Sequence, residues 1–156
     1  FDFSEIKYIY DYSFENCYGI TCESLNLVNL QSIGIKSFYN CSGLKGKLTL
    51  SDELKYLSSE AFYNCTGLEG SLKIPDKVDI IGGSTFYNCF GFTGDLILPA
   101  DLSSIYENAF YNCNGFNGNL ILKGNKIKLL KESAFYNCNG LKGSLKIPSS
   151  LNKIES

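Results

Sequence analysis

Seven cysteines are the side chains of this 156-residue sequence best suited to covalent or metal chemistry. Six of them recur every 24 residues, with a last step of 25: Cys17, Cys41, Cys65, Cys89, Cys113 and Cys138. Equivalent residues of a stacked repeat point the same way, whereas a disulfide needs two Cβ atoms that face each other. We therefore predict that the thiols from Cys41 to Cys138 form a buried column and pack as small hydrophobic groups. Cys22 lies outside the series. The sequence does not decide whether Cys17 and Cys22 form a disulfide.

Histidine is absent from the sequence. Its absence excludes Ser-His-Asp and Cys-His nucleophile pairs, His-based zinc sites and the usual general base near neutral pH. No CxxC pair, phosphate-binding loop or calcium-binding repeat occurs either. We expect no catalytic residue, no metal and no cofactor, and carboxylate chemistry is the one enzymatic route left open.

An asparagine precedes every cysteine of the series, and from the second cysteine on these residues are Asn40, Asn64, Asn88, Asn112 and Asn137. Asparagine favours turns because its side chain bonds to nearby backbone groups, so we predict that these amides satisfy turn backbone. Asn40-Cys41-Ser42 and Asn64-Cys65-Thr66 also match the glycosylation acceptor pattern. An amide buried in a turn cannot carry a glycan, and we expect little occupancy.

The same period governs the whole chain, since a phenylalanine recurs at Phe14, Phe38, Phe62, Phe86, Phe110 and Phe135. A fixed period of this length is typical of a solenoid. We predict one array over 1–156: a half period 1–13, full periods 14–37, 38–61, 62–85, 86–109 and 110–134, and a partial period 135–156. The opening half period is either a specialised cap or a cut within the array, and the last residues begin a period that stops early.

Each period has three parts. A Leu-x-Leu run predicts a short strand with one inward face: Leu48/Leu50, Leu72/Ile74, Leu96/Leu98, Leu120/Leu122 and Leu145/Ile147. A turn follows, and then the spacing of Leu54, Leu57, Ala61 and Phe62 predicts a short helical or 3₁₀ segment on the opposite side. The inward positions of one period are Phe62, Cys65, Leu68, Leu72, Ile74, Val78, Ile81 and Thr85. One period cannot fold alone, so the periods must stack.

Candidate binding residues lie on two parts of the repeat. The outward strand positions include Lys73, Ile97, Ile121 and Lys146, and solenoids usually bind through this extended surface. Ile97 and Ile121 form a small apolar pair, which is either a contact site or a chance neighbour pair. Tyr63, Tyr87, Tyr111 and Tyr136 form a second candidate stripe, in which ring stacking and recognition are compatible.

Composition argues against two classes of partner, nucleic acid and the membrane interior. The net charge is −2 without a basic cluster, which argues against nucleic acid. No apolar run is long enough to cross a bilayer, so we expect no direct membrane insertion.

The run from Gly70 to Cys89, with Leu72, Ile74, Pro75 and Phe86 at fixed spacing, resembles the treponemal-type leucine-rich repeats of BspA-like proteins. The resemblance covers almost the whole chain, although this sequence carries one extra residue per period and lacks proline in several repeats. It implies a right-handed leucine-rich-repeat coil with short parallel β-strands on one face. It also implies a surface or secreted location and a role in adhesion.

We therefore predict a non-enzymatic, extracellular or cell-surface module that recognises a protein or glycoprotein through its solenoid face. The partner is expected on host extracellular matrix or on another cell surface. The alternative is a structural spacer, or a coat segment that self-associates through exposed ends.

Overall fold

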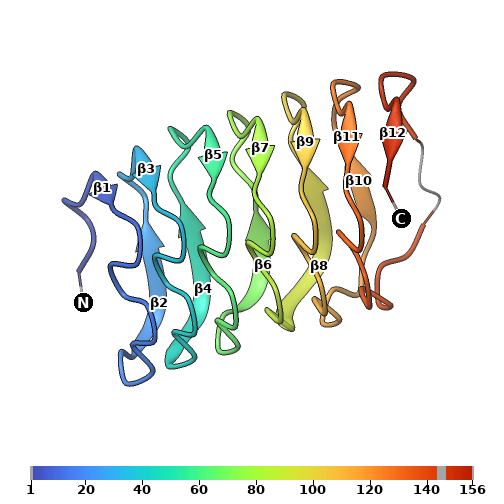
Figure 1. Ribbon diagram of the computed structural model, residues 1–156. Coiled ribbons are helices and arrows are strands. Elements are labelled where there is room, and N and C mark those ends of the chain that lie inside the picture. Colours follow the sequence, from blue (N-terminus) through green and yellow to red (C-terminus); the bar gives the residue numbers. More distant parts are fainter. Residues whose placement is uncertain (1, 144–146, 156) are drawn as a thin grey trace.

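In the computed structural model, which describes residues 2–143 and 147–155, the chain winds into a solenoid of stacked coils (Figure 1). Each coil adds a longer strand to one row and a two-residue strand to another. The longer strands are β2 (Cys22–Leu27), β4 (Leu44–Leu50), β6 (Glu69–Lys73), β8 (Gly91–Leu98) and β10 (Leu120–Leu122). The short strands are β1 (Tyr8–Ile9), β3 (Ser32–Ile33), β5 (Tyr56–Leu57), β7 (Ile80–Ile81), β9 (Ser104–Ile105), β11 (Leu129–Leu130) and β12 (Lys153–Ile154).

All strand pairs are parallel and join equivalent residues of neighbouring coils. β2 pairs with β4, and β6, β8 and β10 form a three-stranded sheet in which Leu96 pairs with Leu120. The short strands form the sheets β1–β3 and β5–β7–β9–β11–β12. This arrangement confirms four of the five predicted Leu-x-Leu strands, and Leu145 of the fifth lies outside the described residues.

The predicted helical or 3₁₀ segment is wrong. The residues after Leu54 form the short strand β5 and then a series of turns, and no helix occurs in 2–143 or 147–155. In the turn segment, which we define as residues 58–68 and their equivalents, three alternate N–H groups donate outside their own coil. Glu60, Phe62 and Asn64 donate to the carbonyls of Gly83, Thr85 and Tyr87 in the next coil at 2.8–2.9 Å.

Left-handed residues are the physical reason why this segment cannot be a helix. Glu60 and Asn64 have φ of 57° and 54°, and equivalent residues of the other coils share this conformation. A left-handed residue at every fourth position interrupts a right-handed helix. The backbone N–H groups of Ala61, Tyr63 and Cys65, each next to one of these residues, close local turns by donating to the carbonyls three residues earlier. Asparagine suits the second of the two positions because it tolerates positive φ.

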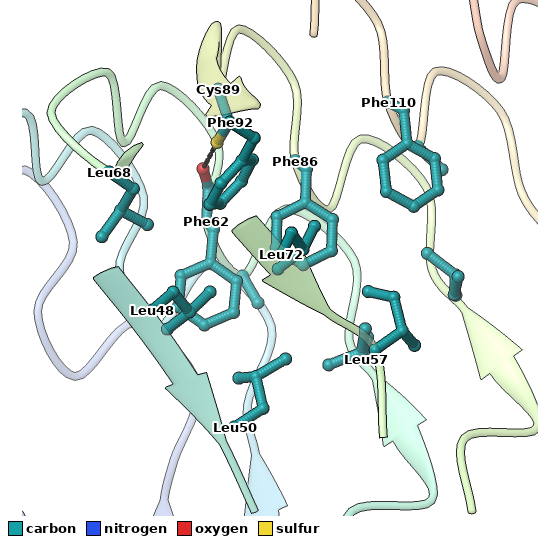
Figure 2. Packing of buried hydrophobic residues seen from close by; sticks show 14 of the residues in the cluster. Leu48, Leu50, Leu57, Phe62, Leu68, Leu72, Phe86, Cys89, Phe92 and Phe110 are labelled. Atoms are coloured by element: carbon teal, nitrogen blue, oxygen red, sulfur yellow. Dashed lines mark hydrogen bonds between the residues drawn. The ribbon is translucent and has the colours of Figure 1, made fainter. Parts of the chain in front are cut away.

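The core lies between the strands and the turn segments, and it consists of columns of equivalent apolar side chains, such as Phe62, Phe86 and Phe110 (Figure 2). All eight inward positions predicted for the period of Phe62 are buried. Phe14, Phe38, Phe62, Phe86, Phe110 and Phe135 stack with ring centroids 5.2–5.7 Å apart. Phe3 packs edge-on against Phe14 and Phe38 at the N-terminal end of this column.

One glycine column sets how closely the coils approach. A Cβ atom on Gly67 would lie 2.3 Å from the carbonyl oxygen of Leu44, and one on Gly91 would lie 2.3 Å from that of Leu68. Gly19 occupies the same place in the first coil, yet no atom lies within 4 Å of its Cβ position. The requirement for glycine therefore comes from the neighbouring coil and not from the turn itself.

We predict that Gly67→Ala lowers the free energy of unfolding by about 2–3 kcal/mol, because the methyl group must push two coils apart. The matched variant Gly19→Ala is expected to change it by no more than about 0.5 kcal/mol. Urea denaturation of both variants checks this, and equal effects at the two positions would contradict the close-approach explanation.

Candidate functional site

The outward residues of the longer strands form one surface, which we call the long-strand face. Lys73 pairs in register with Ile97, and Ile97 with Ile121. Lys73 is exposed, Ile97 is partly exposed and Ile121 is 36% exposed. The structure thus brings three of the four predicted strand residues side by side. Lys146 lies outside the described residues.

A hollow of about 340 Å³ opens beside this row. It is lined by Ser71, Leu72, Lys73, Ile74, Asp95, Ile97 and Lys123. A smaller hollow of about 180 Å³ lies on the other side of Lys73, lined by Val28, Lys47, Leu48, Thr49, Leu50 and Asp52 together with Lys73 itself. The long-strand face is therefore uneven, with apolar floors between polar rims.

Both lysines at the larger hollow are paired within the chain, whereas Asp95 has no ion pair among the described residues. The Lys73 ammonium lies 2.9 Å from the Asp52 carboxylate, and that of Lys123 lies 3.1 Å from Asp76. The hydrogen bond to Asp52 raises the pKa of Lys73, so the lysine stays charged at neutral pH. These pairs are highly exposed and contribute little to stability, but they leave few uncompensated charges on this face.

The predicted tyrosine stripe exists as a regular stack on the turn segments. Tyr39, Tyr63, Tyr87, Tyr111 and Tyr136 follow one another with ring centroids 4.6 Å apart. Tyr136 is 57% exposed and the other four are partly exposed. Burial, with the neighbouring tyrosines, raises the pKa of Tyr63 and Tyr111. Because these residues belong to the turn segments, the structure does not place them with Lys73, Ile97 and Ile121.

The asparagine amides bond to one another, which corrects the expectation that they satisfy turn backbone. The Nδ2 of Asn40 donates to Oδ1 of Asn16, and that of Asn64 to Oδ1 of Asn40. The same bond recurs at Asn88, Asn112 and Asn137, at 2.7–2.8 Å. A glycan on Asn40 or Asn64 would attach at the Nδ2 atom that holds this column together, so the arrangement disfavours glycosylation of the folded chain.

The thiol column is confirmed. All seven cysteines are unbridged, including Cys17 and Cys22, and Cys41, Cys65, Cys89, Cys113 and Cys138 are buried. The Cys89 thiol donates to the carbonyl of Phe62 in the preceding coil at 3.1 Å (Figure 2), and the other four buried thiols make the equivalent bond. Burial raises the pKa of Cys65, Cys89 and Cys113 well above its ordinary value and that of Cys41 to about 11. A thiol held protonated is a poor nucleophile.

The rest of the described chain offers no cluster of side chains that could bind a metal ion. No three Cys, Asp or Glu side chains gather as a metal site requires in the ranges 2–143 and 147–155. Nor does the described part of the chain contain a helix long and apolar enough to span a membrane. What the geometry offers is an ordered surface for contact.

Comparison with protein families identifies the repeat. The profile of the BspA-type leucine-rich-repeat region matches the chain in six copies, over residues 2–92 and 55–156. The chain belongs to this BspA-type leucine-rich-repeat family. Leucine-rich-repeat families generally mediate protein interactions and are generally non-enzymatic. No curated protein matches the sequence.

Solved leucine-rich-repeat structures share the fold. A leucine-rich repeat protein from Bacteroides ovatus is 22% identical with a TM-score of 0.66, covering 93% of this chain and 42% of its own. A leucine rich cell surface protein from Faecalibacterium prausnitzii is 24% identical with a TM-score of 0.60, covering 88% of this chain and 42% of its own. The T. pallidum leucine-rich-repeat protein TpLRR is 20% identical with a TM-score of 0.57, covering 86% and 71%. The chain thus spans less than half the length of the first two.

Sequence reasoning missed the residues that shape the hollow. Asp52, Asp76 and Lys123 meet their partners across coils at spacings that do not follow the repeat, so the period gave no signal for them. Phe90 was also missed: it is 50% exposed at the place where equivalent residues are mostly small or polar. Comparing each period with its neighbours, position by position, would have singled out Phe90.

We predict that the buried thiols make the solenoid sensitive to alkali. Below pH 9 the thiols are protonated in both folded and unfolded chains, so their full contribution to stability is present. From pH 9 to about 11 the unfolded chain releases these protons while the buried thiols do not, so the free energy of unfolding falls.

Chemical denaturation of the wild type and of Cys89→Ala at a series of pH values separates this effect from tyrosine and lysine titration. The difference in stability between the two proteins should shrink as the pH rises through this range. A constant difference would mean that the Cys89 thiol does not take part.

Proposed function

We propose that the chain is a non-enzymatic binding module that recognises a protein or glycoprotein partner through its long-strand face. The observation that carries the proposal is the pair of the partly exposed Ile97 and the exposed Ile121, in register beside a hollow on an ordered sheet. Adjacent exposed apolar side chains with a polar rim favour an interaction site. Lys73 and Lys146 are assigned to the same contact surface.

A surface or secreted location and an adhesive role are part of the proposal. Its support is the BspA-type repeat and the similarity in fold to a protein described as a cell surface protein. The partner is expected on extracellular matrix or on another cell surface. The tyrosine stripe of Tyr63, Tyr87, Tyr111 and Tyr136 is a second contact surface, since tyrosine is enriched at interfaces.

The unbroken side-chain columns favour a second candidate function. Stacks of Phe, Tyr, Asn and Cys continue through the array without a break. Such an array is a stiff spacer, or a coat segment that associates with copies of itself. This candidate requires no foreign ligand.

We predict that replacing Ile97 and Ile121 together with Asp weakens binding to immobilised matrix glycoproteins or host-cell surfaces by about tenfold or more, because the centre of the contact loses its apolar surface. The measurement is saturable binding of the chain at physiological salt, with circular dichroism to show that the variant is folded. Tyr56→Asp, on the outward face of β5 and 55% exposed, is the control and should bind normally.

Equal binding by the Ile variant and the wild type would refute the assignment of the long-strand face. Absence of any binding, together with concentration-dependent self-association, would favour the structural candidate.

A further inference from the structure

We infer that the hollow between Lys73 and Lys123 receives one aliphatic or aromatic side chain of an uncharged, extended peptide segment. The inference rests on the proposed function and names the partner chemistry of the same face. It follows from three properties of the hollow: its charges, its floor and its size.

The charged groups at the rim are already engaged. Lys73 binds Asp52 and Lys123 binds Asp76, while Asp95 accepts hydrogen bonds from the backbone N–H and the side-chain amide of Asn119. A polyanion such as a sulfated glycan would have to displace these carboxylates before it met a free ammonium group. Asp95 has no ion pair among the described residues, but a single exposed carboxylate attracts a cation only weakly. The rim therefore disfavours a polyanion and offers little attraction for a cation.

The charges on the adjoining corner follow the same rule. Lys77 bonds to Glu53, and Lys126 pairs with Asp101, each across one coil boundary. Positive and negative side chains thus alternate from coil to coil next to the hollow. A partner that lies along this face meets little net field, so we expect association to depend weakly on salt.

The floor of the hollow is apolar. Leu72 and Ile74 are buried beneath it, and Ile97 forms one wall with Ile121 beside it in register. The seven lining residues include no aromatic ring, although carbohydrate rings usually pack on aromatic faces. These features favour a hydrophobic side chain of a polypeptide over a sugar.

The size of the hollow indicates one side chain as the anchor. A volume of about 340 Å³ is at the lower end of the range typical of ligand pockets. Ser71 at the rim offers a hydroxyl to the peptide backbone on either side of the anchor. An extended segment running along the face would then place its next outward-facing side chain near Ile121.

The test uses the chain labelled at isoleucine δ1 methyl groups and observed by NMR. The probes are N-acetyl-leucinamide, N-acetyl-phenylalaninamide and a sulfated heparin disaccharide. We expect saturable shifts of the Ile97 and Ile121 methyls with the two amides, of similar size at low and high salt, and none with the disaccharide. Ile35, exposed on a turn segment, is the reference methyl and should not move.

A double variant sharpens the test. Lys77→Ala combined with Lys126→Ala, on the corner beside the hollow, should leave the amide affinity within about twofold, because these paired charges are not the binding determinant. Loss of amide binding in this double lysine variant would overturn the inference.

Shifts with the disaccharide that disappear at high salt would also overturn it, and would make the partner a polyanion on the same face. Equal movement of Ile35 would reveal unspecific adsorption and overturn it as well. Neither result bears on whether the Ile97/Ile121 variant loses binding to a surface-immobilised partner, so the proposed function is judged separately.

Discussion

The cross-coil hydrogen bonds of the turn segments are the interaction on which this structure depends. In the five coils that contain Phe14, Phe38, Phe62, Phe86 and Phe110, three alternate N–H groups donate to the next coil, as Phe86 does to Ala109 and Asn88 to Tyr111 at 2.8 Å. Strand pairing alone joins the coils over only two residues in the short-strand sheets and a few in the longer ones. The turn segments add a third line of attachment and fix the register of everything beside them.

Once the coils are in register, equivalent side chains have no choice of neighbour. The phenylalanines must stack in the core, the tyrosines on the surface and the asparagines beside them, while each buried thiol meets a carbonyl of the preceding coil. Cysteine and asparagine, which in other proteins often bind metals or take part in catalysis, here hold neighbouring coils together. This explains why a cysteine-rich, asparagine-rich chain presents contact surfaces and why the variable outward positions are where specificity can arise.

The repeat period, the Leu-x-Leu strands and the inward positions follow from the sequence because they depend on local pattern and on burial. Phe62, Leu72 and Ile81 lie in the core as their spacing predicts. The conformation of the turn segment cannot be predicted in this way, because its apolar spacing also fits a helix. Only the left-handed backbone of Glu60 and Asn64 excludes a helix. The pairing of Ile97 with Ile121 was accessible from the period. The hollow beside it was not, because its lining combines non-equivalent residues of three coils, such as Ser71, Asp95 and Lys123.

Native-state hydrogen exchange, resolved residue by residue, tests the central role of the turn segments most directly. If the cross-coil bonds hold the solenoid together, the amides of Phe62, Asn64, Phe86 and Asn88 should exchange as slowly as the strand amides of β6 and β8, through global unfolding. If these turn amides instead exchange rapidly while the strands stay protected, the sheets alone hold the coils together, and the cross-coil bonds of the turn segments do not have the central role assigned to them.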